Sequence, residues 1–366
     1  MIPFQEFYSF YRRYFRIVVT QTFMDPRSLP SLITRFLTLL RIMTRGERRR
    51  RSNVEKLSIP VPRIAIFSVT WQCNLSCTGC YALNFSVKEG LSIESIMKVI
   101  NEGTELGVFI WTIAGGEPVL VETLLERLVE VKGSYFLFYT NATCIEDSHI
   151  ALFRKGRNIL PVVSIEGEGS ATDDRRGAGV GEKVRATMGR LRRARVPFAF
   201  STMVTHENCG EVTSRRWLDS LWVAGARFGF LVDYIPCKKN LVPSFVLTDE
   251  DRAYKQAELA RRNAEARPVV FNLPPDEYES GECLAAGKGL IHINADGYVE
   301  PCPFSHYAAD NVRDSSLRES LDSPFLREIR TLTTKLDNPK KECMLFRHGT
   351  RVAEVAGKTG AVWTEQ

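Results

Sequence analysis

The fold is decided by one stretch, Trp71-Gln72-Cys73-Asn74-Leu75-Ser76-Cys77-Thr78-Gly79-Cys80-Tyr81, which holds three of the nine cysteines. Directly before it, residues 64–69 read Ile-Ala-Ile-Phe-Ser-Val. This apolar run of β-branched and aromatic residues predicts a buried strand. The cysteines therefore lie on a loop at the C-terminal end of a strand, where barrel-type α/β folds build their functional sites.

The spacing Cys-x3-Cys-x2-Cys at Cys73, Cys77 and Cys80 indicates a metal site. Thiolates are soft ligands, and three of them can hold three irons of a [4Fe–4S] cluster while the fourth iron stays open to a small molecule. The alternatives are a zinc site and ordinary core cysteines. A structural zinc site takes four nitrogen or sulfur ligands, and the loop offers no fourth, so we favour the cluster.

The composition is that of a globular chain with a large core, since 44% of the 366 residues are hydrophobic. Charges at Arg12, Arg13 and Arg16 interrupt the N-terminal residues, so we expect no secretory signal and a cytoplasmic location. Nine cysteines in such a chain indicate metal rather than a disulfide framework. No apolar run reaches the roughly 20 residues of a membrane-spanning helix.

The net charge of +6 is concentrated near the N-terminus. The first 55 residues hold eleven arginines against four acidic residues, which leaves the rest of the chain close to neutral. A near-neutral body argues against nucleic acid as a partner.

Residues 1–57 are predicted to form a helical N-terminal extension. Its two helices carry an aromatic or aliphatic face, and the second ends in an arginine cluster at residues 45–51. Such a surface suits an anionic membrane, so one expectation is a peripheral membrane contact through residues 1–52. The other is a pair of helices packed on the domain and followed by a solvated basic linker.

Strand-like and helical runs alternate through residues 58–267. We expect strands at 64–69, 108–113, 135–139, 160–165, 198–204 and 228–235, and helices near 93–105, 120–131, 147–154, 182–195, 211–224 and 248–266. Six strand–helix repeats imply a parallel sheet with right-handed crossovers, curved into a partial (β/α)6 barrel of the TIM type. The proline-rich residues 268–275 read as a linker.

Residues 268–366 are expected to form a small second domain. The runs 290–294 and 298–301 flank Ala295-Asp296-Gly297, which predicts a hairpin with Asp-Gly at its turn. Three further cysteines bracket this hairpin and the helical segment 317–331, namely Cys283, Cys302 and Cys343.

The loop of Cys73, Cys77 and Cys80 after a first strand resembles the signature of the radical S-adenosylmethionine (SAM) superfamily. The resemblance implies that the open iron chelates the amino and carboxylate groups of SAM. It also implies that one electron, from a donor such as flavodoxin or ferredoxin, cleaves SAM to a 5′-deoxyadenosyl radical that abstracts hydrogen from a substrate. The family often has an aromatic residue before the third cysteine. Here Gly79 stands there, and Tyr81 is the nearby aromatic residue.

Later motifs resemble the family in the expected order. Gly115-Gly116-Glu117-Pro118 resembles the motif that binds the methionine amino group; its glycines allow close backbone approach, and Glu117 can pair with an ammonium group. Residues 174–177 resemble a stretch whose arginine helps to hold the cofactor. The implied cofactor-binding residues are Gly115, Gly116, Glu117, Pro118, Thr140, Asn141, Ser164, Glu166, Arg176 and Tyr81. The alternative is that strand-end polar residues only cap turns and helices.

Cys283, the hairpin and Cys302 resemble the auxiliary-cluster region of the SPASM/twitch subgroup, which implies a second iron–sulfur cluster. The full SPASM pattern has more cysteines than Cys283, Cys302 and Cys343, so we expect one twitch-like cluster. His306 and Cys237 are candidates for its fourth ligand, or its fourth iron stays open to substrate. The alternatives are a zinc site and free thiols.

Cys237 follows the sixth strand, at the expected barrel mouth. Some members of the resembled family, notably epimerases, use such a thiol to return hydrogen to the substrate radical. The alternative is a partly buried small hydrophobic residue.

These features predict a radical SAM enzyme that abstracts hydrogen from a small or lipid-like substrate. An auxiliary cluster favours an oxidative outcome, because it could take an electron from the product radical. We favour a lipid-like substrate over a peptide, because the N-terminal region lacks the strands of a leader-recognition module. The alternatives are a maturase of ribosomally made peptides, an epimerase, and a non-enzymatic iron–sulfur or zinc interaction module.

Overall fold

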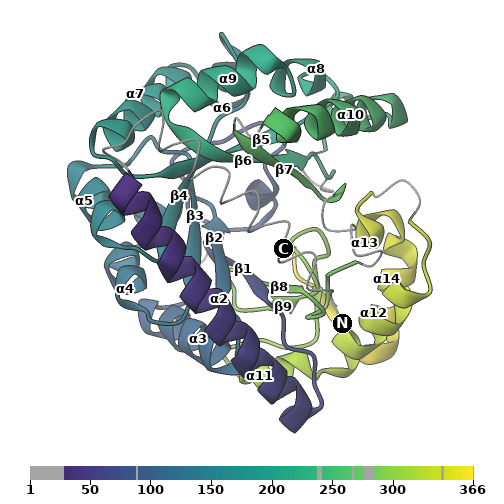
Figure 1. Cartoon of the computed structure of the whole chain (residues 1–366). Coiled ribbons are helices and arrows are strands. Elements are labelled where there is room, and N and C mark those ends of the chain that lie inside the picture. Colours follow the sequence, from purple (N-terminus) through teal and green to yellow (C-terminus); the bar gives the residue numbers. More distant parts are fainter. Residues whose placement is uncertain are drawn as a thin grey trace. The chain divides into compact units, whose positions relative to one another are not determined.

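The computed structural model describes residues 29–87, 90–236, 241–265, 268–275, 283–338 and 342–365 (Figure 1). Two compact units divide the chain. One, here the first unit, comprises the chain up to Thr38, residues 141–234 and residues 242–276, and the second unit comprises the rest. Because barrel strands fall in both units, the units do not coincide with the expected domains 1–57, 58–267 and 268–366. That division stays a prediction.

Helix α2 (Leu29–Leu57) is the first described element, and it packs on the protein. Near its N-terminal end, Arg35 is 3% exposed and donates hydrogen bonds to the carbonyl oxygens of Ile159 at 2.9 Å and Phe153 at 2.5 Å. Further along, a Cβ on Gly46 would come within 2.6 Å of the Phe109 side chain. Four apolar side chains of α2 are buried, namely Leu32, Leu39, Ile42 and Met43, while Ile33 and Leu37 are exposed. Residues 1–28 lie outside the described residues.

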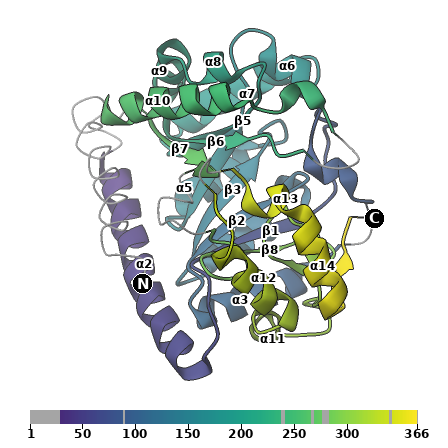
Figure 2. The same cartoon turned by 90° about the vertical axis from the view of Figure 1, so that its right-hand side faces the viewer.

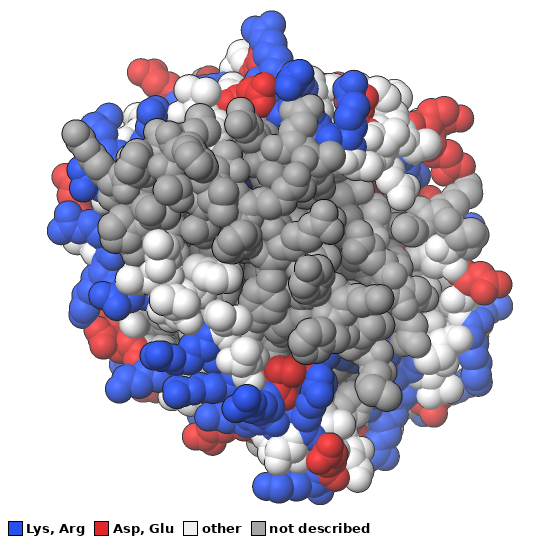
Figure 3. All heavy atoms as spheres, viewed as in Figure 1, with Lys and Arg blue, Asp and Glu red and all other residues white. Residues whose placement is uncertain are grey.

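Positive charge gathers over the C-terminal half of α2 (Figure 3). The exposed arginines of this half are Arg41, Arg45, Arg48, Arg49 and Arg51. In the part of the chain that the structure describes, no helix is long and apolar enough to cross a membrane.

The second unit contains the strands β1 (Ile64–Thr70), β2 (Ile110–Gly115) and β3 (Tyr135–Thr140). They are parallel, with Ile64 opposite Ile110 and Ile110 opposite Tyr135. Helices α3 (Ile93–Leu106) and α4 (Leu124–Glu130) connect them. Parallel strands are covered on both faces, so their side chains on both faces are buried. The fully buried aromatic side chains include Phe67, Trp111, Phe136 and Phe138.

The first unit continues the alternation with β4 (Ile159–Ser164), β5 (Phe198–Val204), β6 (Ala226–Asp233) and β7 (Val269–Leu273), each parallel to the next. Its helices are α5 (Asp147–Lys155), α6 (Ala171–Arg176), α7 (Val180–Arg193), α8 (Cys209–Val212), α9 (Arg215–Ala224) and α10 (Asp249–Glu265). The fold is therefore α/β, with the parallel strands of a partial TIM-type barrel, as predicted.

One correction concerns the expected linker at residues 268–275. Residues 269–273 form β7, which pairs with β6 in the register Phe228 to Val269. The prolines at either end of this short run suggested a linker. They bound the strand without entering it, so they remove no hydrogen bond from the ladder.

The predicted hairpin is confirmed as β8 (Leu290–Ile293) and β9 (Val299–Glu300). Gly297 at its turn has a φ of +91°. The sequence did not show that β8 also pairs with β1 in parallel, with Ile64 opposite Leu290. The second unit also contains β10 (Tyr307–Ala308) and β11 (Val362–Trp363). Its C-terminal helices are α11 (Leu317–Leu321), α12 (Pro324–Thr334), α13 (Met344–Arg347) and α14 (Gly349–Thr359), which are labelled in Figure 2.

Glu47 on α2 is expected to make stability depend on pH. Burial alone would raise the pKa of Glu47, but hydrogen bonds from Arg50 and Arg51 and the charge of Arg63 lower it to about 2. The contribution of a carboxylate with a lowered pKa is present above its unfolded pKa and is lost as the pH falls through the folded value. Glu47→Gln should therefore lower stability near neutral pH by about 1 kcal/mol, after allowance for solvent screening.

Thermal unfolding from about pH 7 to about pH 3, followed by circular dichroism, measures this effect. The difference between wild type and Glu47→Gln should shrink as the pH falls. Glu55→Gln, at an exposed position of the same helix, is the control and should leave the curve unchanged. A constant difference across the pH range would contradict the role of Glu47.

Candidate active site

The cysteine loop begins directly after β1 and closes into the short 3₁₀ helix η2 (Tyr81–Asn84). Cys77 is buried, and Cys73 and Cys80 are half-buried. Gly79 has a φ of +71°, and the Cys80 N–H donates to the Cys77 carbonyl at 3.2 Å. This left-handed turn explains why glycine precedes the third cysteine.

The three thiols lie within electrostatic reach of one another and of Glu117. Burial raises the pKa of Cys73, a hydrogen bond from the Leu75 N–H at 3.4 Å opposes this, and the negative charges of Glu117, Cys77 and Cys80 raise it further. Thiolates held this closely persist only with a cation among them. The donor set fits an iron–sulfur cluster, which binds thiolates at different irons.

A single metal ion would need its ligands around one point. Within the described ranges, no three His, Cys, Asp or Glu side chains form such a group. The assignment of Cys73, Cys77 and Cys80 to the cluster rests on their spacing, and it stays a prediction.

The glycine turn after β2 touches the cysteine loop through main-chain atoms. The Gly116 N–H donates to the Thr70 carbonyl at 2.6 Å, and the Glu117 N–H donates to the Gln72 carbonyl at 2.9 Å. A Cβ on Gly116 would lie 2.1 Å from the Gln72 oxygen. Gly115 has a φ of +120°, and a Cβ there would lie 2.3 Å from the Thr70 oxygen. Both positions therefore require glycine.

Glu117 is 1% exposed and sits at the start of the 3₁₀ helix η3 (Pro118–Leu120). Its carboxylate accepts a hydrogen bond from the Val119 N–H at 3.2 Å. Glu117 thus caps η3, as the capping alternative expects, and also faces the cysteine loop. Its contact with the cofactor stays a prediction.

The side chain of Tyr81 contacts Ser68 on β1. Its hydroxyl lies 3.1 Å from Ser68 Oγ, and its ring meets Trp71 edge-on at 6.2 Å between centroids. In the same unit, Thr140 is buried at the end of β3. Their contacts with cofactor stay predictions.

Asn141 and Ser164 lie in the first unit. Asn141 Oδ1 accepts hydrogen bonds from the Thr143 N–H at 2.9 Å and from Thr143 Oγ1 at 2.6 Å, so it closes a local turn. Ser164 ends β4 and is half-buried. Their predicted role toward a cofactor is not tested by these contacts.

Glu166 and Arg176 are brought together, and the structure adds Arg175 to them. Glu166 is 2% exposed; its Oε1 pairs with both guanidinium groups, with Arg176 Nε at 2.8 Å, and its Oε2 accepts from the Met203 N–H at 3.1 Å. Burial alone would raise the pKa of Glu166, but the charges of Arg175 and Arg176 lower it. The two predicted residues, Glu166 and Arg176, thus form an ion pair with each other. Their contacts with the cofactor stay predictions.

Cys283, Cys302 and Cys343 are all buried in the second unit. The Ala286 N–H donates to the Pro301 carbonyl at 2.9 Å, which ties the segment after Cys283 to the hairpin end before Cys302. Cys343 lies directly before α13. Their role as auxiliary-cluster ligands stays a prediction.

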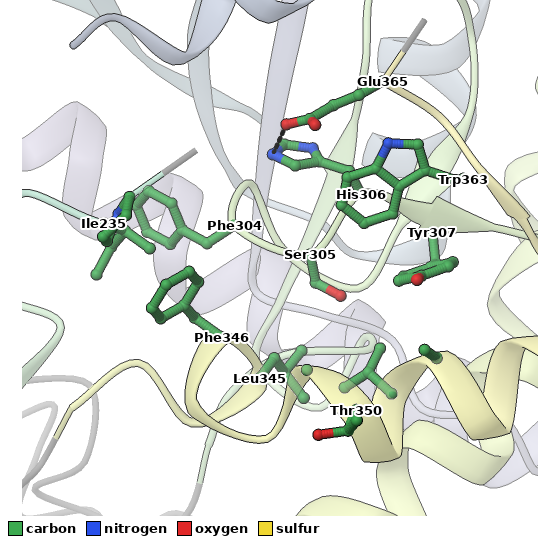
Figure 4. A pocket seen from close by; sticks show the side chains of 14 residues that line it. Ile235, Phe304, Ser305, His306, Tyr307, Leu345, Phe346, Thr350, Trp363 and Glu365 are labelled. Atoms are coloured by element: carbon green, nitrogen blue, oxygen red, sulfur yellow. Dashed lines mark ion pairs between the residues drawn. The ribbon is translucent and has the colours of Figure 1, made fainter. Parts of the chain in front are cut away.

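His306 lies between two carboxylates. Its Nε2 is 3.5 Å from Glu365 Oε1 (Figure 4), and its Nδ1 is 3.5 Å from Glu300 Oε2. Burial would lower the pKa of His306, but the two carboxylates outweigh burial and raise it. The role of His306 as a fourth ligand stays a prediction, and Cys237 lies outside the described residues.

Sequence reasoning missed a buried polar chain between β1 and the hairpin. Ser68 Oγ lies 2.9 Å from His292 Nε2, and His292 Nδ1 lies 2.6 Å from Glu300 Oε2. Glu300 Oε1 accepts from Thr364 Oγ1, and Asn84 Nδ2 donates to Glu365 Oε1 at 3.2 Å. One signal in the sequence could have pointed to this chain: Ser68, His292 and Glu300 are polar residues in otherwise apolar strand segments.

An aromatic contact chain runs beside this polar chain. Trp71 stacks on Phe85 at 3.9 Å between centroids, and Phe85 meets the His306 ring edge-on at 5.3 Å. Trp71 Nε1 also donates to Asp296 Oδ2 at 2.9 Å, in the hairpin turn. The cysteine loop and the hairpin are therefore held together within the second unit.

A pocket of about 380 Å³ opens in the second unit. Its wall contains residues that follow Cys302 and Cys343 by two or more positions, together with the C-terminal segment (Figure 4). Among the lining residues are Phe304, Ser305, His306, Tyr307, Phe346, Trp363 and Glu365. None of them except His306 was singled out from the sequence.

Two protein families match the chain. The Radical SAM superfamily matches residues 67–216, which include the cysteine loop, the glycine turn and Arg176. The SPASM iron–sulfur cluster-binding domain matches residues 283–344, which begin at Cys283 and include Cys302 and Cys343. The first domain implies a [4Fe–4S] cluster and SAM, and the second implies auxiliary iron–sulfur clusters.

Three relatives show moderate similarity. The AdoMet-dependent heme synthase of Methanosarcina barkeri is 27% identical over 288 residues, which are 70% of this chain and 81% of that protein. The sporulation killing factor maturation protein SkfB of Bacillus subtilis is 27% identical over 268 residues, 69% of this chain and 64% of that protein. The PqqA peptide cyclase of Rhizobium meliloti is 27% identical over 288 residues, 70% of this chain and 72% of that protein.

Solved structures share the fold. Streptococcus suis SuiB bound to S-adenosylmethionine has a TM-score of 0.65 and 15% identity, covering 78% of this chain and 71% of that one. Native anSMEcpe with bound AdoMet and Cp18Cys peptide has a TM-score of 0.60 and 18% identity, covering 78% of this chain and 87% of that one. At these identities the likeness establishes the architecture alone.

The contact between the glycine turn and the cysteine loop can be tested at Gly116. In Gly116→Ala the new Cβ would collide with the Gln72 carbonyl, next to Cys73, so the loop must shift. We expect iron and sulfide content after anaerobic reconstitution to fall by up to one cluster, and the release of 5′-deoxyadenosine from SAM to fall at least about 100-fold.

Gly210→Ala is the matched control, since nothing lies within 4 Å of a Cβ at that position. It should retain wild-type iron and wild-type release of 5′-deoxyadenosine. Wild-type iron content and activity in Gly116→Ala would show that the glycine turn does not position the loop.

Proposed function

We propose that this chain, which belongs to the radical SAM superfamily and carries a SPASM-type iron–sulfur cluster-binding domain, removes a hydrogen atom from a peptide side chain. Bound together, a reduced [4Fe–4S] cluster and SAM supply the 5′-deoxyadenosyl radical that makes such an abstraction possible. The protein's own residues hold, orient and shield these groups.

In this proposal Cys73, Cys77 and Cys80 bind the cluster. The close approach of Gly116 to the Gln72 carbonyl holds the glycine turn against the cysteine loop, and this turn would hold the methionine end of SAM. Glu117, buried and facing the same loop, would pair with the methionine ammonium group.

The relatives support a peptide rather than the lipid-like substrate that the N-terminal sequence favours. By their names, SkfB matures the sporulation killing factor and the PqqA peptide cyclase acts on a peptide. Leu32, Leu39, Ile42 and Met43 of helix α2 are buried in the protein, which weakens the argument for a lipid. The peptide-modifying alternative is therefore the better reading.

The single observation that carries the proposal is the pocket beside Cys302 and Cys343. A volume of about 380 Å³ is at the lower end for ligand sites and suits one large side chain. Phe304 and Leu345, which line the pocket, each follow one of these cysteines by two positions, and Cys302 and Cys343 would help to hold an auxiliary cluster that supplies an electron acceptor.

The proposed reaction balances as an oxidation. Removal of one hydrogen atom from the peptide side chain would have to be followed by loss of one electron and one proton to give an oxidised product. An auxiliary cluster held by Cys283, Cys302 and Cys343 would supply the electron acceptor, and solvent would take the proton. A reductant such as flavodoxin or ferredoxin supplies the electron that cleaves SAM.

A second candidate substrate is a tetrapyrrole, because the Methanosarcina barkeri relative is a heme synthase and 81% of its length is covered. Deuterium transfer separates the two candidates. The full chain, reconstituted anaerobically and reduced, is given SAM with either a randomised peptide library deuterated in its side chains or an iron tetrapyrrole deuterated in its side chains. We expect mass spectrometry to find deuterium in 5′-deoxyadenosine from the peptides only.

Deuterium transfer from the tetrapyrrole alone would overturn the peptide proposal, as would the absence of transfer from every peptide. A Cys73→Ala variant is the control for non-enzymatic exchange and should release no 5′-deoxyadenosine in either arm.

A further inference from the structure

Four aromatic side chains line the pocket, and three separate segments supply them (Figure 4). Phe304 and Tyr307 come from the loop after Cys302 and from β10, which follows that loop; Phe346 comes from α13, and Trp363 comes from β11. Tyr307 and Trp363 meet edge-on at 4.8 Å between centroids. Aromatic rings favour such edge-to-face or offset contacts with a further ring, so these walls suit an aromatic ligand.

Phe346 is large and apolar, yet 45% exposed. It lines the pocket and belongs to the four-residue helix that follows Cys343. An aromatic ligand in the pocket would cover part of this ring and remove apolar surface from water, which is favourable by about 25 cal/mol per Å².

Ser305 supplies a polar atom that nothing in the described chain satisfies. The residue is 5% exposed, and its Oγ has no hydrogen-bond partner in the described parts of the protein. In Figure 4 the hydroxyl points into the pocket. An unpaired buried hydroxyl is costly, so a ligand with a polar atom at this place regains part of that cost.

The pocket offers no unpaired charge. Among its described lining residues, only His306 and Glu365 can carry a charge at neutral or acidic pH. They face each other, with 3.5 Å between His306 Nε2 and Glu365 Oε1. Glu365 Oε1 also accepts from Asn84. A charged side chain would have to lose its hydration without a free partner, which is costly. The ligand is therefore neutral.

We propose that this pocket binds a tyrosine side chain of the peptide substrate, with its ring among Phe304, Phe346 and Trp363 and its hydroxyl on Ser305 Oγ. The proposal rests on the proposed function, because it assumes a peptide substrate. Tyrosine combines the three required properties, since its side chain is aromatic, neutral at physiological pH, and able both to donate and to accept a hydrogen bond.

Ser305 is thus a specificity-determining residue. A site with a buried hydroxyl discriminates against a ligand that lacks the matching polar group, because binding then leaves the hydroxyl unpaired. Wild type should distinguish tyrosine from phenylalanine, and Ser305→Ala should lose that distinction.

Binding of two small probes tests this without catalysis. The reconstituted full chain is titrated with N-acetyl-L-tyrosinamide and with N-acetyl-L-phenylalaninamide, and ligand-observed NMR gives the two affinities. Wild type should prefer the tyrosine amide by about fivefold to tenfold, which corresponds to one net hydrogen bond. Ser305→Ala should bring the ratio to about one without weakening the phenylalanine amide.

Two further variants place the binding site. Phe346→Ala, at a half-exposed position of the pocket, should weaken both amides to a similar extent. Ser220→Ala, on α9 of the first unit and outside the pocket lining, should keep the wild-type ratio. Equal binding of the two amides by wild type, a preference that survives in Ser305→Ala, or no binding of either amide would each overturn the proposal.

The outcome is separable from that of the proposed function. Deuterium transfer from peptides without a preference for the tyrosine amide would reject the tyrosine pocket and leave the peptide function standing. A clear preference that disappears in Ser305→Ala, without deuterium transfer from any peptide, would reject the peptide reaction while the pocket retained its selectivity.

Discussion

The site depends on a main-chain contact, the two hydrogen bonds by which the glycine turn after β2 holds the loop after β1. Gly116 and Glu117 donate to Thr70 and Gln72, and Cys73 follows Gln72 directly. The position of the first cysteine is therefore set by backbone atoms of a neighbouring strand end. Because parallel strands present their C-terminal ends together, strands β1 and β2 bring a metal-binding loop and a close-approach turn to one place.

A second constraint is the buried polar chain within the second unit. It begins at Tyr81 next to the third cysteine, passes through Ser68 and His292, and reaches Glu300 two residues before Cys302. Each hydrogen bond inside a low-dielectric interior strengthens its neighbours, and an unpaired member would be costly. The chain thus ties the loop of one predicted cluster to the hairpin of the other, and the pocket lies beside this connection.

The barrel repeats, the hairpin and the two cysteine groups could be predicted from the sequence, because periodicity, Asp-Gly turns and cysteine spacing are local signals. Strand β7 was read as a linker because prolines bound it, and its pairing with β6 is not local. Ser68, His292 and Glu300 were missed because each looks like an exception within an apolar strand until the strands are placed together. The lipid reading arose from an apolar and arginine-rich helix whose partners, such as Phe109 and Ile159, are distant in sequence.

The central claim is that Cys73, Cys77 and Cys80 hold the cluster that cleaves SAM, while Cys283, Cys302 and Cys343 hold a separate one. The most direct measurement is the iron and sulfide content, with electron paramagnetic resonance after reduction, of the Cys73→Ala/Cys77→Ala/Cys80→Ala variant beside wild type. The account predicts that the variant keeps roughly half of the iron, retains one cluster signal and releases no 5′-deoxyadenosine. Unchanged iron content, or release of 5′-deoxyadenosine by the variant, would contradict it, and so would the loss of all iron from a folded protein.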